Sequence, residues 1–266
     1  MTVDENKTPQ PTNMPWFRIT YDVGLGINYS WLIQLADGRF VAVDPGVTEP
    51  FTDTITTHGI ELAAIVLTHK HKDHIGGSDQ LASIHNVPVY APSEVTSKVT
   101  HRVKGGDLLV IGDSTIQVID TGGHTLGHVS FYIPEQQMVI TGDALFAMGC
   151  GRMMEGYADM MWQGLKRLKA LSDDTMVFCG HEYSEANAHF ALSLSPQNPR
   201  VIARARRIKT ARCHDEATVP YRLGDDKITN PFLLYDKQQL ATAVGLAPDT
   251  PDDQVFAALR YMKDQF

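Results

Sequence analysis

Thr68-His69-Lys70-His71-Lys72-Asp73-His74 is the stretch that decides the fold, because it places potential metal ligands directly after an apolar run. That run, residues 62–67, contains β-branched residues and is short, which predicts a buried strand. The ligands therefore lie where a strand ends and a turn begins. A rigid sheet that carries polar residues on the loop after a strand is a common way to build a site.

The four potential ligands of this stretch divide into two pairs. Side chains alternate along an extended chain, so His69 and His71 project to the same side and can hold one ion. Beyond the turn, Asp73 and His74 can face a second ion. Neutral imidazoles suit zinc or iron, and a carboxylate helps to neutralise a divalent charge.

Composition limits the classes of protein to consider. The 266 residues fit one large domain, or one domain with a smaller appendage, and 43% hydrophobic residues support an ordinary core. A formal charge of -8 disfavours a general nucleic-acid surface or an anionic-membrane surface. No apolar run approaches the roughly 20 residues that span a bilayer. We expect a small-molecule substrate, and an anionic one would need a local basic pocket.

Residues 1–15 are polar and contain proline, without the hydrophobic segment of a secretory signal. Asp4 and Glu5 lie where a transit peptide avoids acids, so we predict a disordered tail. The three cysteines are odd in number and widely spaced, which is typical of reduced thiols. These features predict a cytoplasmic protein, and we expect a monomer.

Hydrophobic periodicity and turn residues predict mixed hairpins interrupted by single helices, hence an α/β sandwich with helices outside its sheets. Asp37-Gly38 and Gly112-Asp113 are hairpin turn signals. The predicted strands are 29–35, 40–43, 62–67, 87–90, 108–111, 115–119, 129–133, 138–141 and 176–179. The predicted helices are 49–58, 78–85, 184–194, 199–211 and 252–262.

Three later strands also end in a residue that can bind metal. His124 follows strand 115–119, Asp143 follows 138–141, and His181 follows 176–179, where the last two each come directly after a glycine. Together with the first stretch this gives five imidazoles and two carboxylates. A tetrahedral structural zinc takes four ligands, so the set fits two ions with open positions for solvent.

The chain resembles the metallo-β-lactamase fold superfamily and, within it, glyoxalase II, the hydroxyacylglutathione hydrolases. The motifs that carry the resemblance follow the family's order: THKHKDHIGG, GGHTLGH, ITGDALF, GCGRMMEG, FCGHEY, TNPF and the terminal KDQF. The resemblance implies an αβ/βα sandwich followed by a smaller all-helical domain. It places the catalytic domain at residues 16–183 and a helical substrate-binding domain at residues 184–266.

The resemblance also implies roles for single residues. One metal ion is expected on His69, His71 and His124, the other on Asp73, His74 and His181, with Asp143 bridging both. The ions are expected to be two divalent cations per chain, zinc first, with iron and manganese as alternatives. The residues expected to bind glutathione are Arg152, Tyr183, Arg260 and Lys263.

The implied reaction is cleavage of S-(2-hydroxyacyl)glutathione, with S-lactoylglutathione yielding lactate and glutathione. We expect a hydroxide that bridges the metals to attack the thioester carbonyl, with Asp73 fixing that hydroxide by a hydrogen bond. The family commonly has Lys where Arg152 stands and Tyr where Met154 stands, and these departures affect contacts to the thiol carrier, not the hydrolytic chemistry. The alternatives are an iron-dependent persulfide dioxygenase, a hydrolase of another thiol's thioester, a β-lactamase-type hydrolase, and a non-catalytic metal-binding or partner-docking protein.

Overall fold

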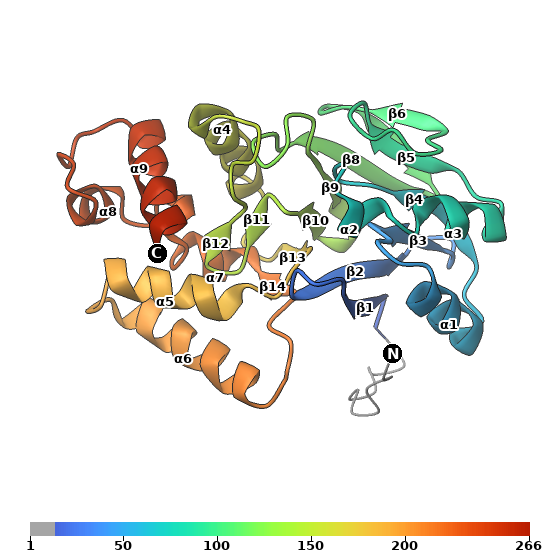
Figure 1. Ribbon diagram of the computed structural model, residues 1–266, viewed down its shortest axis with the longest axis horizontal. Helices are drawn as coiled ribbons and strands as arrows, with labels where there is room; N and C mark the ends of the chain where they lie inside the picture. The colour runs from blue at the N-terminus through green and yellow to red at the C-terminus, as the bar shows by residue number, and fades with distance from the viewer. Residues whose placement is uncertain (1–13) are drawn as a thin grey trace.

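The computed structural model describes residues 14–266, and nearly all of the predicted N-terminal tail lies outside these described residues. Two six-stranded mixed sheets face each other, and helices gather at one end of the molecule (Figure 1). The first sheet has the order β1-β2-β3-β4-β5-β6. Its strands are β1 Trp16–Asp22, β2 Ile27–Gln34, β3 Phe40–Val43, β4 Leu62–Val66, β5 Val89–Pro92 and β6 His101–Val103.

The second sheet has the order β14-β13-β10-β9-β8-β7. Its strands are β7 Leu108–Ile111, β8 Ser114–Asp120, β9 Val129–Ile133, β10 Met138–Gly142, β13 Met176–Cys179 and β14 Tyr221–Arg222. A two-stranded ribbon, β11 Leu145–Phe146 with β12 Gly149–Cys150, leads away from β10. The predicted α/β sandwich and both predicted hairpins are confirmed.

Alternation along the inner strands explains how each sheet is buried. In β2, Trp31 and Ile33 belong to the core shared with the second sheet, whereas Leu32 between them packs toward helices α1 and α3. Phe131 and Phe178 meet the first sheet from the other side. Both faces of these strands are therefore covered, which is why their sequences are nearly continuous apolar runs.

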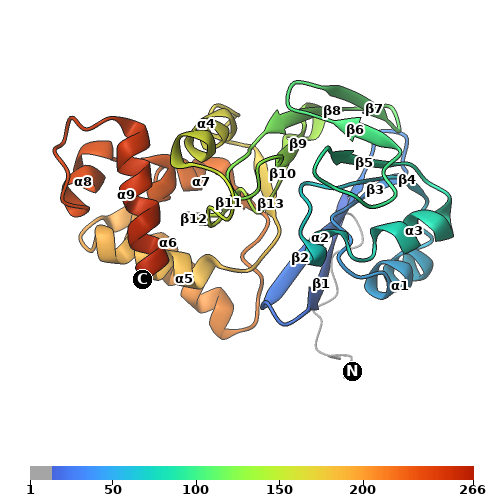
Figure 2. The same cartoon turned by 45° about the horizontal axis from the view of Figure 1, so that its top comes forward.

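Helices cover the first sheet and form the C-terminal part. Figure 2 shows α1 and α3 beside the first sheet and the later helices grouped together at the far end. The helices are α1 Glu49–His58, α2 Lys72–Ile75, α3 Ser78–His85, α4 Ala158–Lys169, α5 Ser184–Leu194, α6 Pro199–Cys213, α7 Leu223–Lys227, α8 Lys237–Ala243 and α9 Asp252–Gln265, with short 3-10 turns at Pro134–Gln136 and Pro231–Leu233. Among the described residues, no helix is both long and apolar enough to cross a membrane.

Helix α4 was not predicted from the sequence, although it joins the two parts of the chain. Trp162 of α4 stacks on Phe256 of α9 with ring centroids 6.0 Å apart. Gly164 interrupts the helical pattern because a methyl group there would lie 2.9 Å from the Cα atom of Thr121. The close approach to the end of β8 thus requires a residue of low helix propensity in mid-helix.

One smaller difference has a local cause. The strand predicted at 87–90 begins instead at Val89, since Pro88 has no N–H for a sheet hydrogen bond. The thiols of Cys150, Cys179 and Cys213 are free, as predicted, and the first two are buried. Burial raises the pKa of Cys150 to about 11, although the Arg260 guanidinium opposes this, so the thiol is protonated and unreactive at neutral pH.

Candidate metal centre

Strand ends from both sheets converge on the candidate site. The predicted strand 62–67 ends as β4 at Val66, and the turn that follows carries His69 and His71 before α2 begins at Lys72. Asp143 follows β10 directly, and its neighbour Gly142 pairs with the end of β13. The predicted metal ligands are thus held at the ends of strands from both sheets.

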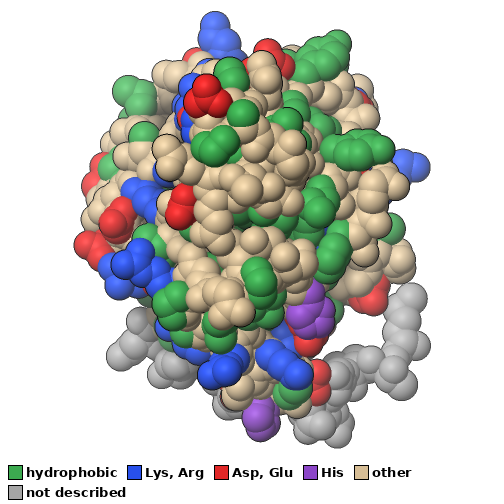
Figure 3. Space-filling model, turned by 90° about the vertical axis from the view of Figure 1, so that its left-hand side faces the viewer, with side chains coloured by type: hydrophobic (Ala, Val, Ile, Leu, Met, Phe, Trp, Pro, Cys, Tyr) green, Lys and Arg blue, Asp and Glu red, His purple; other side chains and the backbone are tan. Residues whose placement is uncertain are grey.

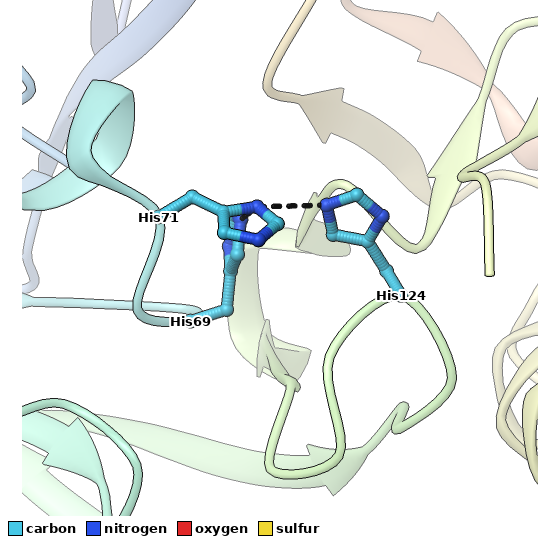
Figure 4. A group of neighbouring side chains, drawn as sticks. All are labelled: His69, His71 and His124. Carbon is cyan, nitrogen blue, oxygen red and sulfur yellow. Dashed lines mark hydrogen bonds between the residues drawn. The ribbon is translucent and has the colours of Figure 1, made fainter. Parts of the chain in front are cut away.

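Three imidazoles form a first group. His71 Nδ1 lies 3.0 Å from His69 Nε2 and 3.0 Å from His124 Nε2 (Figure 4). Three ring nitrogens of three side chains therefore point at one another from two different loops. Neutral imidazoles do not converge in this way without a shared cation or proton, and three converging nitrogens are typical of a catalytic zinc site, whose fourth position is left for solvent or substrate.

A second group lies beside the first. His181 Nε2 is 3.4 Å from Asp73 Oδ2 and 3.4 Å from His74 Nε2, and His74 Nε2 is 3.5 Å from the same carboxylate oxygen. His181 reaches this position because residues 27–29 at the start of β2 pair with 180–182: Tyr29 N–H donates to the Gly180 carbonyl at 2.7 Å. This group contains one carboxylate and two imidazoles.

Asp143 lies between the two groups. Its Oδ2 atom is 3.5 Å from His124 Nε2 of the first group and 3.3 Å from His181 Nε2 of the second. Its Oδ1 atom lies 3.4 Å from His74 Nε2, yet this atom is buried and has no hydrogen-bond partner within residues 14–266. A buried carboxylate oxygen without a partner is costly unless a cation or proton compensates it.

In three of the five imidazoles, the ring nitrogen that faces away from the ligand group has a partner that fixes the direction of the other nitrogen. His124 Nδ1 donates to the Arg152 carbonyl at 2.8 Å, which leaves Nε2 as the free acceptor. His74 Nδ1 lies 3.1 Å from Asp44 Oδ2, and His69 Nδ1 lies 2.9 Å from Thr68 Oγ1. Such partners orient metal-binding imidazoles and increase their basicity.

Asp44 is a functional residue that the sequence prediction missed. It accepts hydrogen bonds from both Thr68 N–H at 2.7 Å and Thr68 Oγ1–H at 2.6 Å, in addition to its contact with His74. Its proximity to His69 and His74 makes a third possible ligand group. However, Asp44 contacts the outer nitrogen of His74, so it supports the ligand and lies behind it. The sequence feature that could have identified Asp44 was its place directly after the predicted strand 40–43.

Asn28 and His128 also contact the site from outside. Asn28 Nδ2 donates to Asp73 Oδ2 at 3.0 Å, and its side chain is fully buried. The Asp143 N–H donates to His128 Nε2 at 3.2 Å, so His128 carries its proton on Nδ1, which lies 2.9 Å from Thr121 Oγ1. Complete burial lowers the pKa of His128 well below its ordinary value, which keeps the ring neutral.

The electrostatics of the site show that its carboxylates require positive charge. Burial would raise the pKa of Asp143, but the adjoining imidazoles of His181 and His74 hold it well below its ordinary range. Burial likewise opposes protonation of His181, yet the neighbouring Asp143 and Asp73 carboxylates raise its pKa to about 9. The Asp143 and Asp73 carboxylates thus stay ionised and stabilise a cation placed between them.

The donor set fits divalent metal ions. The inward atoms are imidazole nitrogens, carboxylate oxygens, and one buried oxygen of Asp143 that has no hydrogen-bond partner among the described residues. These donors suit zinc, iron or manganese, and their chemistry does not select one of them. Sharing of Asp143 by both groups is the arrangement that a dinuclear centre requires.

The residues predicted to bind glutathione lie at different depths. Tyr183 is 37% exposed and stacks on His181, with ring centroids 4.8 Å apart and planes 7° apart. Arg152 has a largely exposed side chain whose Nε lies 3.3 Å from Asp264 Oδ1. Lys263 Nζ donates to the Ala186 carbonyl at 2.9 Å.

Arg260 differs from the other three, because it is only 4% exposed. Its predicted neighbour Lys263 lies on the same helix, α9, but is partly accessible. The helical end of the molecule, seen in Figure 3, presents Lys and Arg side chains intermingled with Asp and Glu. A basic pocket for an anionic substrate would therefore be a local one.

Comparison with known proteins agrees with this architecture. Residues 23–181 match the metallo-beta-lactamase superfamily, and residues 182–266 match the hydroxyacylglutathione hydrolase C-terminus. A hydroxyacylglutathione hydrolase of Cereibacter sphaeroides is 39% identical over 246 residues, which cover 91% of this chain and 96% of that protein. These matches confirm the resemblance recognised in the motifs.

Solved structures share the fold. The BLEG-1 B3 metallo-beta-lactamase has a TM-score of 0.62 at 22% identity and covers 82% of this chain and 99% of its own. TTHA1623, solved in a di-iron-bound form, has a TM-score of 0.58 at 26% identity and covers 81% and 99% respectively. The chain belongs to the metallo-beta-lactamase superfamily and, within it, to the family of the hydroxyacylglutathione hydrolases.

Proposed function

We propose that this protein hydrolyses S-(2-hydroxyacyl)glutathione, with S-lactoylglutathione as the substrate, to a 2-hydroxy acid and glutathione. The observation that carries the proposal is the pair of ligand groups joined by Asp143, in a chain whose C-terminal part matches the hydroxyacylglutathione hydrolases. We also propose that the protein acts as a cytoplasmic monomer. Its three free cysteines support a reducing compartment.

Two divalent ions are proposed to bind in the two groups. His69, His71 and His124 would hold one, whereas Asp73, His74 and His181 would hold the other, and Asp143 would contact both. When bound, such ions lower the pKa of a coordinated water and act as Lewis acids toward a carbonyl oxygen. The carboxylates of Asp73 and Asp143 would offset part of the positive charge of these ions.

The side chains around the ligands supply binding and orientation. Tyr183 lies against the ring of His181 and forms a partly exposed wall next to the ligands. Lys263 and Arg152 provide positive charge for the carboxylates of glutathione. The leaving group is a thiolate whose conjugate acid has a pKa of about 8.5, so no side chain has to act as a strong general acid.

The direct test is thiol release from S-lactoylglutathione by the metal-loaded protein and by the same protein after treatment with a chelator. We expect rapid release only from the loaded protein. Oxygen uptake on glutathione persulfide, without release of thiol from the thioester, would contradict the proposal and identify a persulfide dioxygenase. If thiol were released only from the thioester of a thiol other than glutathione, thioester hydrolysis would stand as the reaction and glutathione would be rejected as the carrier.

Lys263 leads to a prediction about pH. Burial lowers its pKa to about 8, with Arg260 adding repulsion, while Cys150 and Asp264 oppose the shift. The side chain is charged below this pH and loses its proton above it. The KM for the anionic thioester is therefore expected to rise as the pH increases through about 8.

Two variants check this prediction against other causes of pH dependence. Lys263→Arg keeps its charge over the whole range and should remove the rise in KM, because the guanidinium does not deprotonate. Lys263→Ala should raise the KM about 10-fold or more at neutral pH, as expected for a lost charge-assisted hydrogen bond. A KM profile that is identical in all three proteins would remove Lys263 from the binding site.

A further inference from the structure

Helix α2 carries two of the three proposed ligands of the second group, Asp73 and His74, yet it is only four residues long. A single helical turn cannot maintain its own conformation, because it forms too few internal hydrogen bonds to offset the cost of ordering the chain. The positions of these two ligands therefore depend on contacts that other segments make with α2. Such contacts come from the turn after β3 and from one side chain of β1.

The turn after β3, residues 44–46, lies directly against α2. The Gly77 N–H, just beyond the helix, donates to the Pro45 carbonyl at 2.8 Å. A methyl group on Gly46 would lie 1.9 Å from the Asp73 carbonyl oxygen and 2.5 Å from the hydroxyl oxygen of Tyr21. The backbone of Asp73 and the hydroxyl group of Tyr21 thus fill the space beside this turn.

The hydroxyl group of Tyr21 joins the turn to α2. It donates to the Asp73 carbonyl at 2.8 Å and accepts a hydrogen bond from the Gly46 N–H at 3.2 Å. Ser30 Oγ lies 2.8 Å from the same oxygen, and the Ser30 hydroxyl donates to the Asp44 carbonyl at 2.5 Å. One phenol oxygen of β1 therefore contacts β2, the turn after β3, and α2.

We propose that Tyr21 is a positioning residue for the metal ion of the second ligand group. Its hydroxyl group fixes the backbone of α2 at Asp73 and thereby directs the side chains of Asp73 and His74. Its ring packs against the apolar cluster between the first sheet and helices α1 and α3, which keeps the hydroxyl group in place. The inference rests on the proposed function in one respect, the assignment of Asp73, His74 and His181 as ligands of one ion.

The first ligand group is linked to Tyr21 less directly. His69 and His71 lie before α2, and His124 comes from the loop between β8 and β9. Within residues 14–266, no hydrogen bond of the Tyr21 hydroxyl reaches any of these three histidines. Loss of the hydroxyl group is therefore expected to weaken the two ions unequally, whereas a general loss of structure would weaken both.

Tyr21→Phe tests the proposal, because it keeps the ring and removes only the hydroxyl oxygen. Crystals of the variant and of the unchanged protein, equilibrated at the same chelator-buffered limiting zinc concentration, give the occupancy of each anomalous peak. The peak at the second ligand group should lose occupancy, corresponding to zinc binding at least about 10-fold weaker, as for other changes in groups that orient ligands. The peak at the first ligand group should keep most of its occupancy.

Tyr235→Phe is the matched control. The Tyr235 hydroxyl donates to Ser195 Oγ at 2.5 Å in the helical part of the chain, so this variant loses a part-buried hydroxyl contact without a change at α2. Both zinc affinities of the control should remain those of the unchanged protein in competition with a chelator. Thermal unfolding of each metal-free variant measures the general effect of the change on stability.

Two results would overturn the proposal. One is unchanged zinc occupancy at both ligand groups in Tyr21→Phe. The other is an equal loss at both groups together with a lower unfolding temperature, since Tyr21 would then support the fold as a whole and not one ion. A loss confined to the second ligand group, with both zinc affinities unchanged in Tyr235→Phe, is the result that the proposal predicts.

Failure of the proposed function gives a different result. If the unchanged protein bound two ions without hydrolysing the thioester, the substrate would be wrong, but the unequal effect of Tyr21→Phe would remain. If the unchanged protein bound a single ion, held by the first ligand group, the second group would not be a metal site and the role of Tyr21 would be rejected with it.

Discussion

Asp143→Ala is expected to lose metal and to release thiol at a rate at least about 100-fold lower than the unchanged protein. The carboxylate lies between the two ligand groups, at 3.5 Å from His124 Nε2 and 3.3 Å from His181 Nε2. Alanine would remove the shared oxygen and leave the two groups without their common negative charge. Both ions should therefore bind more weakly.

Elemental analysis after gel filtration, together with the rate of thiol release, measures this effect. Asp249→Ala is a suitable control, because Asp249 is exposed in the loop before α9 and its loss changes the net charge equally. We expect that control to keep its metal content and turnover. If Asp143→Ala retained its full metal content, the bridging role of the carboxylate would be wrong.

Gly180→Ala is expected to have the second large effect. A methyl group at this position would lie 2.5 Å from Asp143 Oδ1 and 2.6 Å from His74 Cε1. Neither neighbour can move away freely, since both are buried between the two sheets. Overpacking of this kind costs about 1–3 kcal/mol and displaces the side chains that it meets. We expect metal affinity to fall about 10-fold to 100-fold, as for other changes that misplace ligands.

Metal titration with a chelator, followed by thermal unfolding of the metal-free protein, separates the two consequences of this change. The matched variant is Gly245→Ala, which has open space for a methyl group but a positive φ of 79°, so it should cost about 1–2 kcal/mol of backbone strain. It should lose stability without losing metal affinity. Equal metal affinity in Gly180→Ala and the unchanged protein would show that the site tolerates the methyl group.

Local patterns predicted the elements that carry the site. The apolar run before Thr68 marked the strand β4, and the glycines before Asp143 and His181 marked two more strand ends. Helices 49–58, 78–85 and 184–194 have the predicted bounds, because their ends carry turn and stop residues that act locally. These parts depend on neighbours in the sequence, so a single sequence is sufficient.

The remaining parts depend on contacts between distant segments. Asp44 and Asn28 reach the site only after β3 has paired with β4 and β2 has paired with β3. The one local signal was the place of Asp44 directly after a strand, and Asn28 has no such signal. Arg260 is separated from Cys150 by 110 positions, so its burial could not be predicted from its spacing to Lys263. Helix α4 could not be predicted for the same reason: Gly164 interrupts its helical sequence pattern, and this glycine is required by a close contact with the end of β8.

The most direct test of the account is a crystal structure of the metal-loaded protein, measured at the absorption edge of the bound metal. We predict two anomalous peaks about 3.5–4 Å apart. One should lie among His69, His71 and His124, and the other beside Asp73, His74 and His181, with Asp143 between them. A single peak, or a peak coordinated by Asp44 together with His69 and His74, would contradict the dinuclear centre.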